Sequence, residues 1–328
     1  MRSLALFSPL IALMAIIFAG AGTAYLKGRN LPRANDNYSV SSSGEEKYPK
    51  TIQSPDATVL TLLAPPRRVL ALSTGAEEII VELSGPEVLA GISRFTRNPR
   101  YSNVVDEVAS IPKTIVGNRT EQIVRLHPDL VLISNYTDRR ARNLLERCGI
   151  EVFPLPEPKN IQSIQETIGI IGQILGKEER AFELLASMQA RLNFIRDKLP
   201  SGRHPEIIHL SDTNPLWVYG SQTVIGEIIK LAGCRNLAVE KGITGFKNIN
   251  RESIARWDPE WILLEEKSKS LDFYIEQFKR DPILSNLSCL HANKIIAIPS
   301  RKLTSVSHHV IDAVEMLFGM VYGDESKR

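Results

Sequence analysis

The stretch Thr120–Leu132, TEQIVRLHPDLVL, returns in the second half of the chain as Arg251–Leu263, RESIARWDPEWIL. Glutamate, isoleucine, arginine and proline coincide in the two copies, and acidic and apolar positions match in type. Each copy predicts a short helix with a glutamate in its first turn, ended before proline and followed by a buried parallel strand. The repeat therefore indicates two equivalent halves, each of which presents one such helix.

A long stretch of apolar periodicity lies between the two copies and predicts a helix over residues 177–199. Its apolar residues recur at three- and four-residue steps, and they are Ala181, Leu184, Leu185, Met188, Leu192, Ile195 and Leu199. At 1.5 Å per residue such a helix is roughly 34 Å long, enough to join two lobes. A core helix of one large domain is the alternative; the patterns on either side favour the joining helix.

Short β-rich runs alternate with helical patterns on both sides of this helix. The runs are residues 59–62, 68–72, 88–92, 130–133, 151–153, 206–210, 261–264 and 294–298. Alternation of this kind is typical of βα units with parallel sheets. The predicted fold class is α/β, with two βα lobes of mainly parallel sheets joined by one long α-helix. We place the N-terminal lobe at residues 51–176, the linker helix at 177–200 and the C-terminal lobe at 201–325.

The amino terminus has the order of a secretory signal, because an arginine precedes an uncharged run at residues 4–18 and small residues at 19–24. Residues 1–24 are predicted to be a signal peptide that exports the chain to the periplasm. An uncleaved N-terminal anchor is the alternative, since the uncharged run is long enough to span a bilayer. Residues 25–50, rich in serine, asparagine and charge, are predicted to be a flexible leader.

Composition excludes several classes of protein. The net charge of +3, from 40 basic and 37 acidic residues among 328, is nearly balanced, which argues against a nucleic-acid partner.

The three cysteines lack zinc-module spacing. Cys234 and Cys289 could form a disulfide, which would leave Cys148 free and buried behind Leu144 and Leu145. Because no cysteine precedes Cys148, we expect no lipid-modified N-terminal cysteine.

No catalytic constellation stands out, so we predict that the chain is not an enzyme and needs no cofactor. Nucleophile-elbow, phosphate-loop, dinucleotide and zinc-protease motifs are all missing from the sequence. His308 and His309 are adjacent, and neighbouring residues on a helix point about 100° apart, so they are poor ligands for one metal ion. A metal-dependent enzyme that uses these two residues and His209 is the weaker alternative.

Aromatic and basic residues gather where predicted strands end, which is where open α/β sheets bind ligands. In the first half they are Arg94, Phe95, Arg97, Arg100, Tyr101, Asn135 and Tyr136, and in the second half Trp217, Tyr219, Phe246, Arg301 and Lys302. Each of them alone is typical of solvated surface. Their recurrence at equivalent ends of two sheets favours a ligand site in a cleft between the lobes.

The sequence also resembles a known family, the periplasmic binding proteins of ABC importers for ferric siderophores, haem and cobalamin. The resemblance is carried by residues 58–62, 65–69, 72–73 and 78–80, followed by the segment 121–131, and it extends from about Thr51 to Met320. It implies two βα lobes that are joined by one long helix and move little on binding. It also implies an ABC permease dimer as the partner of a monomeric receptor.

Carried over residue by residue, the resemblance implies roles for particular side chains. Glu121 and Glu252 match the two glutamates, one per lobe, that dock onto arginines of the permease. Residues 214–220 keep the spacing of a cleft loop. Phe95, Trp217 and Phe246 match cleft aromatics of the family, and Arg301 matches a polar ligand contact. Together with the strand-end residues above, the predicted ligand-binding residues are Arg94, Phe95, Tyr101, Trp217, Tyr219, Phe246 and Arg301, and no metal ligand is predicted.

The chain departs from the haem-binding pattern near Tyr101. Ser102 stands where a proline usually follows the iron-ligating tyrosine, and the spacing from Arg94 is one residue longer. The predicted cationic rim favours an anionic ferric siderophore as the ligand. Haem and cobalamin are alternative ligands, and a membrane-anchored sensor of the same fold without transport is an alternative function.

Overall fold

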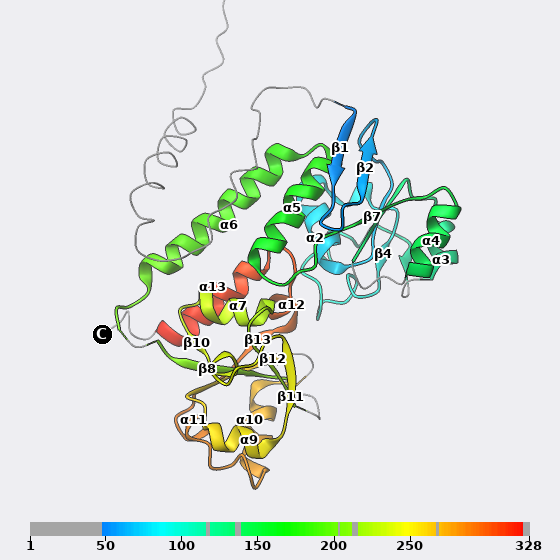
Figure 1. The fold of residues 1–328 in the computed structure, drawn as a ribbon. Helices are drawn as coiled ribbons and strands as arrows, with labels where there is room; N and C mark the ends of the chain where they lie inside the picture. Colours follow the sequence, from blue (N-terminus) through cyan, green and yellow to red (C-terminus); the bar gives the residue numbers. More distant parts are fainter. Residues whose placement is uncertain are drawn as a thin grey trace, which may run out of the picture. The chain divides into compact units, whose positions relative to one another are not determined.

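The computed structural model of the chain describes residues 48–115, 119–134, 139–202, 204–211, 216–266 and 269–323 (Figure 1). The predicted signal segment and most of the predicted leader lie outside these residues, and so do Asn135, Tyr136, Asn214 and Pro215. The described residues form one compact unit. Below, the first half is the part of the chain before helix α6 (Glu178–Lys198), and the second half is the part after it.

The first half is built mainly on parallel strands, and its first two strands form a separate antiparallel pair. Its elements are β1 (Lys50–Gln53), β2 (Val59–Leu62), β3 (Val69–Ala71), α2 (Thr74–Ser84), the 3-10 turn η1 (Pro86–Val88), β4 (Ile92–Ser93), β5 (Thr114–Ile115), α3 (Thr120–Val124), β6 (Leu130–Ile133), α4 (Arg139–Arg147), β7 (Glu151–Pro154) and α5 (Ile161–Leu175). Strands β3, β6 and β7 form one parallel sheet in that order, and β4 pairs with β5 in parallel. A bridge between Val69 and Leu89 places the segment that leads into β4 beside β3.

The second half repeats this architecture. Its elements are β8 (Glu206–Leu210), β9 (Leu216–Tyr219), α7 (Val224–Leu231), β10 (Arg235–Asn236), α8 (Leu237–Glu240), β11 (Phe246–Ile249), α9 (Arg251–Trp257), β12 (Trp261–Glu266), α10 (Leu271–Arg280), α11 (Ser288–His291), β13 (Ile295–Pro299), α12 (Ser300–Leu303) and α13 (Val310–Tyr322). Strands β10, β8, β12 and β13 form a parallel sheet in that order, and β9 pairs with β11 antiparallel. The predicted α/β class with mainly parallel sheets is confirmed.

The sequence repeat is also a repeat of backbone geometry. In each copy a non-glycine residue takes a left-handed conformation just before the proline, His127 at φ 47° and Asp258 at φ 42°. The acidic residue after the proline then accepts backbone N–H groups at the start of the neighbouring strand. Asp129 accepts from Arg67 and Arg68 ahead of β3 at 2.7 to 3.1 Å, and Glu260 accepts from Glu206 in β8 at 3.3 Å.

One long helix, α6 (Glu178–Lys198), occupies the stretch predicted to be the linker helix (Figure 1). Ala181, Met188 and Ile195 are buried at seven-residue spacing, and the other four predicted apolar positions pack against the same core. The helix contacts α5 of the first half and both α7 and α13 of the second half. Arg191 fixes it to α13, because its guanidinium binds Asp312 and Glu315 at 2.6 Å.

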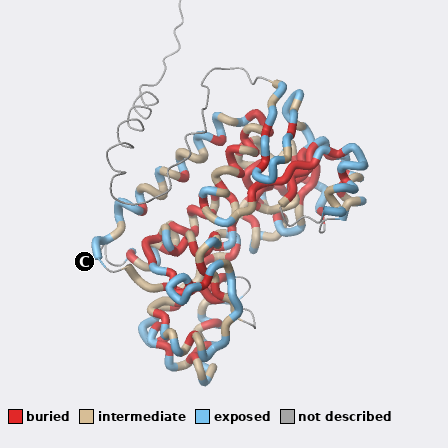
Figure 2. Tube along the Cα trace, in the orientation of Figure 1, coloured by how far each residue is buried: buried red, intermediate tan, exposed pale blue. Residues whose placement is uncertain are grey.

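The hydrophobic core lies in the strands and in the helices that cover them (Figure 2). One cluster of buried side chains contains Phe153 of β7, Met188 of α6 and Leu317 of α13, so it includes residues from both halves. No helix among the described residues is long and apolar enough to cross a membrane.

The cysteines differ in part from the prediction. Cys148 is exposed, and so is Leu144, because Leu145 is the one buried side chain of α4 and the chain leaves the helix just before Cys148. Cys234 and Cys289 are buried and both are free thiols. Burial raises the pKa of Cys234 to about 12 and that of Cys289 to about 11.

Candidate functional site

In the first half, the predicted ligand residues follow the carboxyl end of β4. The guanidinium of Arg94 lies 4.9 Å from the centre of the Phe95 ring, a cation–π distance. The Tyr101 ring meets Phe95 edge-on, with ring centres 5.7 Å apart. Phe95 is 48% exposed, and a large apolar ring held at the surface beside a cation is available for stacking on a ligand.

In the second half, the predicted aromatic residues share one face of the β9–β11 ribbon. Tyr219 lies opposite Phe246 in the register, and Trp217 lies opposite Asn248 two residues away, so the three rings project from the same side. Phe246 is 5.6 Å from Trp217 and 6.1 Å from Tyr219 between ring centres. Phe246 is 64% exposed. The ring of the buried His209 of β8 lies edge-to-face with the Tyr219 ring, with ring centres 5.0 Å apart.

The ribbon is joined to the carboxyl end of the main sheet of the second half. Ser211, which follows β8, accepts a hydrogen bond from the Trp217 backbone at 2.8 Å and donates its own N–H to the Trp217 carbonyl at 3.0 Å. The sequence predicts that Trp217 and Tyr219 follow strand β8. In the structure they do, and both lie on strand β9, which pairs with β11. Cross-strand pairing fixes the direction of a side chain, whereas a free loop does not.

Arg301 of the second half contacts the first-half loop that contains Tyr101. It follows β13, yet its guanidinium donates to the carbonyl of Pro99, which lies in the same loop as Tyr101, at 3.3 Å. In return, the Asn103 side chain donates to the Arg301 carbonyl at 2.8 Å. Residues nearly 200 positions apart in the sequence therefore meet at this point.

A buried carboxylate beneath this junction contacts both halves. Glu78 of α2, 1% exposed, accepts from the backbone N–H of Asn103 at 2.7 Å and from its side chain at 3.0 Å. It also accepts from the hydroxyl of Ser307, which precedes α13. The sequence offers one signal for this residue, a charged pair in the middle of an apolar helix, but the partners of Glu78 cannot be predicted from it.

Glu77, beside Glu78, is buried as well. It accepts the backbone N–H of Ser93 at 2.7 Å and the hydroxyl of Thr96, and so it holds the loop that carries Phe95. Burial raises the pKa of Glu77 to about 8, although the hydrogen bonds from Thr96 and Ser93 act in the opposite direction. The carboxyl is therefore mostly protonated at neutral pH.

Stability should consequently depend on pH through Glu77. The pKa of Glu77 in the folded protein lies above the ordinary value of 4.5. Its stabilising contribution to folding is therefore fully present below pH 4.5 and is lost as the pH rises to about 8. We expect the unfolding free energy to fall by a few kcal/mol over this window, since one pKa unit corresponds to about 1.4 kcal/mol. Glu77→Gln should remove this component. Urea unfolding at a series of pH values, with the exposed Glu107→Gln as control, measures it; parallel curves for wild type and Glu77→Gln would contradict the assignment.

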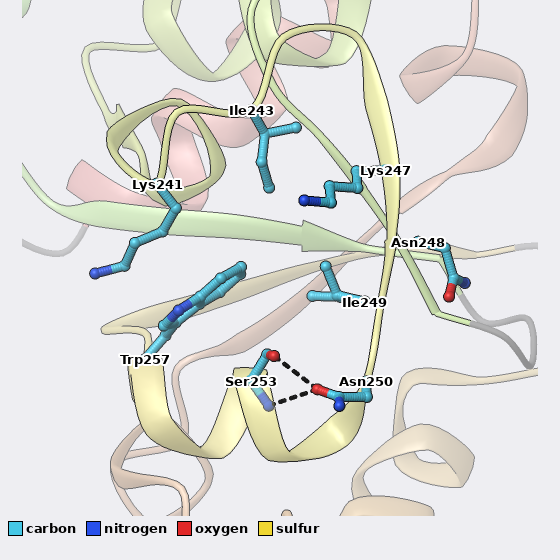
Figure 3. A pocket seen from close by; sticks show the side chains of 8 residues that line it. All are labelled: Lys241, Ile243, Lys247, Asn248, Ile249, Asn250, Ser253 and Trp257. Atoms are coloured by element: carbon cyan, nitrogen blue, oxygen red, sulfur yellow. Dashed lines mark hydrogen bonds between the residues drawn. The ribbon is translucent and has the colours of Figure 1, made fainter.

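The two predicted docking glutamates occupy equivalent places. Glu121 lies in the first turn of α3 and Glu252 in the first turn of α9, and both are exposed. A pocket of about 380 Å³ lies beside Glu252 and is lined by Lys241, Ile243, Lys247, Asn248, Ile249, Asn250, Ser253 and Trp257 (Figure 3). None of the predicted ligand-binding residues lines this pocket.

The described residues contain no group of three or more histidine, cysteine or acidic side chains arranged to hold a metal ion. His308 is buried, its ring centre 4.1 Å from that of His309, and burial lowers its pKa to about 3. His309 faces Asp312 on its own helix at 3.3 Å. His209 lies elsewhere, in β8 beneath the aromatic ribbon.

The parallel βα halves are bridged by one long helix, and each half has a pair of aromatic rings in contact near a strand end. The chain belongs to the periplasmic binding protein family, which it matches over residues 69–302. Members of this family serve ABC transporters as substrate-binding proteins and are not enzymes.

Individual relatives are similar over most of the chain. An uncharacterized ABC transporter substrate-binding lipoprotein of Bacillus subtilis is 24% identical, over 97% of this chain and 96% of its own length. A cobalamin-binding protein of Halobacterium salinarum is 26% identical over 80% of this chain and 71% of its own. An achromobactin-binding periplasmic protein of Dickeya dadantii is 26% identical over 70% and 77%.

Among solved structures, a periplasmic haem-binding protein from Roseiflexus is similar in fold. It superposes with a TM-score of 0.65 and 22% identity, over 79% of this chain and 99% of its own.

Proposed function

We propose that this chain is an exported, monomeric receptor that binds an anionic ferric siderophore between two lobes and delivers it to an ABC permease dimer in the membrane. Family membership supports the transport role, and the names of the relatives support a small ligand and a permease partner. The ligands of these proteins, cobalamin, achromobactin and haem, differ from one another, so similarity in sequence or fold does not select one of them for this chain. The choice rests on the side chains of this chain.

The observation that carries the proposal is that each half has a set of aromatic rings near the carboxyl end of a parallel strand, β4 in the first half and β8 in the second, and that Phe95 and Phe246 of these sets are exposed. Phe95 with Tyr101 in one half, and Trp217 with Phe246 in the other, offer rings that a planar or aromatic chelate could stack on. Arg301, which reaches from one half to the other, supports a ligand position between them.

The charge of the site favours an anion. Three of the five predicted rim cations make hydrogen bonds or ion pairs within the protein: Arg97 binds Thr114 at 2.5 Å and the Ile111 carbonyl, Lys302 binds Asp312 at 2.5 Å, and Arg301 donates to the Pro99 carbonyl at 3.3 Å. Arg94, Arg100 and Arg301 are exposed. Three exposed guanidinium groups, one of which lies against the Phe95 ring, suit a carboxylate or hydroxamate chelate better than neutral cobalamin.

Fluorescence titration of the protein tests the proposal. Ferric citrate-type and ferric hydroxamate siderophores, haemin and cobalamin are added separately while tryptophan emission is followed. We expect saturable quenching by an anionic ferric siderophore, and Trp217→Phe should remove most of it while Trp257→Phe, in the pocket of Figure 3, leaves it intact. If none of these ligands gives a saturable response, the proposed ligand class is wrong. If cobalamin alone gives a response, the argument from charge is wrong.

A further inference from the structure

Helix α2 of the first half meets the second half near its amino end. Gly75 and Glu78 lie three residues apart, on one face of the helix. A Cβ atom on Gly75 would lie 2.5 Å from the Val306 side chain and 2.7 Å from the Val306 carbonyl oxygen, so a side chain there would force the two segments apart. Glu78 accepts a hydrogen bond from the hydroxyl of Ser307, the residue after Val306. The two halves therefore make a close junction at this face of α2.

Both carboxyl oxygens of Glu78 are used in this junction. One oxygen accepts the backbone and side-chain N–H groups of Asn103, at 2.7 and 3.0 Å, and the other accepts the Ser307 hydroxyl. Burial of a carboxyl group costs free energy unless its oxygens are hydrogen-bonded, and an apolar side chain in this helix would avoid that cost. The specific effect of Glu78 is therefore to fix the positions of its hydrogen-bond partners.

Asn103 links Glu78 to Arg301. The nitrogen of its carboxamide group donates to Glu78 at 3.0 Å and to the Arg301 carbonyl at 2.8 Å. The guanidinium of Arg301 in turn donates to the Pro99 carbonyl at 3.3 Å. Arg301 is thus held to one first-half loop through both its main chain and its side chain. Tyr101 lies between the two points of attachment, Pro99 and Asn103.

We propose that Glu78 is a positioning residue of the binding site, which fixes the first-half loop that contains Tyr101 against the second-half segment that contains Arg301. The residues that make this junction, here called the α2 clasp, are Gly75, Glu78, Asn103, Arg301 and Ser307. Groups that are held in place before a ligand arrives lose less entropy on binding, so the clasp favours a chelate that fits the fixed spacing. The roles of Tyr101 and Arg301 toward a ligand rest on the proposed function, whereas the positioning by Glu78 rests on the contacts above.

The distance between two spin labels tests the positioning role without any ligand. The labels are attached at Arg100→Cys, in the loop that the clasp holds, and at Lys230→Cys, on α7 of the second half; both positions are exposed. The full chain also carries Cys148→Ser, because Cys148 is exposed and would react. Cys234 and Cys289 are buried and have raised pKa values, so they stay unlabelled. Double electron–electron resonance then gives the distribution of distances between the loop and α7.

We expect one narrow distribution in the labelled parent and broader distributions for Glu78→Gln and Ser307→Ala, because each change removes a hydrogen bond of the clasp. Gly75→Ala should shift the mean distance, since its Cβ atom would displace the second-half backbone. Thr167→Ala is the matched control: Thr167 is 7% exposed and its hydroxyl bonds a carbonyl of its own helix, so its loss should leave the distribution unchanged. If Glu78→Gln does not fold, Ser307→Ala and Gly75→Ala still decide the question.

A titration with ferric citrate tests whether Glu78 acts through Arg301. Glu78→Gln should weaken binding about tenfold, roughly the contribution of one hydrogen bond to a charged group, and should cause no further loss in the Arg301→Ala variant. An equal loss in both backgrounds would overturn the positioning role, and so would parent-like distance distributions in all three clasp variants. If the wild-type protein does not bind ferric citrate, the ligand assignment fails for this chelate, and the distance distributions alone decide the role of Glu78.

Discussion

Transport is expected to fall more than a hundredfold when Glu121→Lys and Glu252→Lys are combined, while ligand affinity stays at the wild-type value. Both carboxylates are exposed on short helices that precede equivalent strands, and neither helix carries a proposed ligand residue. If each glutamate meets a permease arginine, reversal replaces two attractions by two repulsions. Close charge pairs across interfaces contribute roughly 1.5–7 kcal/mol each, and about 1.4 kcal/mol is tenfold in affinity.

Uptake of labelled ligand by cells that carry the cognate permease measures the effect, and fluorescence titration of the purified variant measures affinity. The matched control reverses one exposed carboxylate per half outside these helices, Glu107→Lys with Asp272→Lys, and should transport normally. Full transport by the Glu121 and Glu252 variant would refute the docking role. A loss of ligand affinity in that variant would assign the two glutamates to the binding site instead.

The fold could be predicted from the sequence wherever the pattern is local. The segments Thr120–Leu132 and Arg251–Leu263 predicted a helix, a proline and a buried strand, and α3 with β6 and α9 with β12 are these elements. Local patterns suffice there because the apolar period and the proline act within a few residues. The same holds for α6, whose stripe persists over 21 residues.

The site could be predicted only in part, because its decisive contacts are long-range. Phe95, Trp217 and Phe246 were identified as strand-end aromatics, but the pairing of β9 with β11 that aligns two of them joins segments about 30 residues apart. The contacts of Glu78 with Asn103 and Ser307 were not predicted, since nothing near Glu78 in the sequence identifies partners 25 and 229 positions away. The burial of Leu145 rather than Cys148 likewise depends on which side of α4 meets the core.

Removal of two aromatic rings, Trp217→Ala with Phe246→Ala, is expected to weaken siderophore binding by about a hundredfold to a thousandfold. The centres of the two rings are 5.6 Å apart, and both rings project from one face of the β9–β11 ribbon. A chelate lying against that face would therefore bury apolar area on both rings. Burial of a large side chain contributes roughly 1.5–3 kcal/mol, and each 1.4 kcal/mol is about tenfold in affinity. Isothermal titration calorimetry measures the change.

A matched control separates this loss from a general effect of removing exposed rings. Phe182 and Phe194 of α6 are 57% and 62% exposed, and Phe182→Ala with Phe194→Ala should bind as wild type does. The rings of the ribbon contribute little to the buried core, so the Trp217 and Phe246 variant should also unfold near the wild-type midpoint. If that variant keeps wild-type affinity, the ribbon is not the ligand platform. If Phe95→Ala alone abolishes binding under the same conditions, the ligand lies on the first half, against Tyr101 and Arg94.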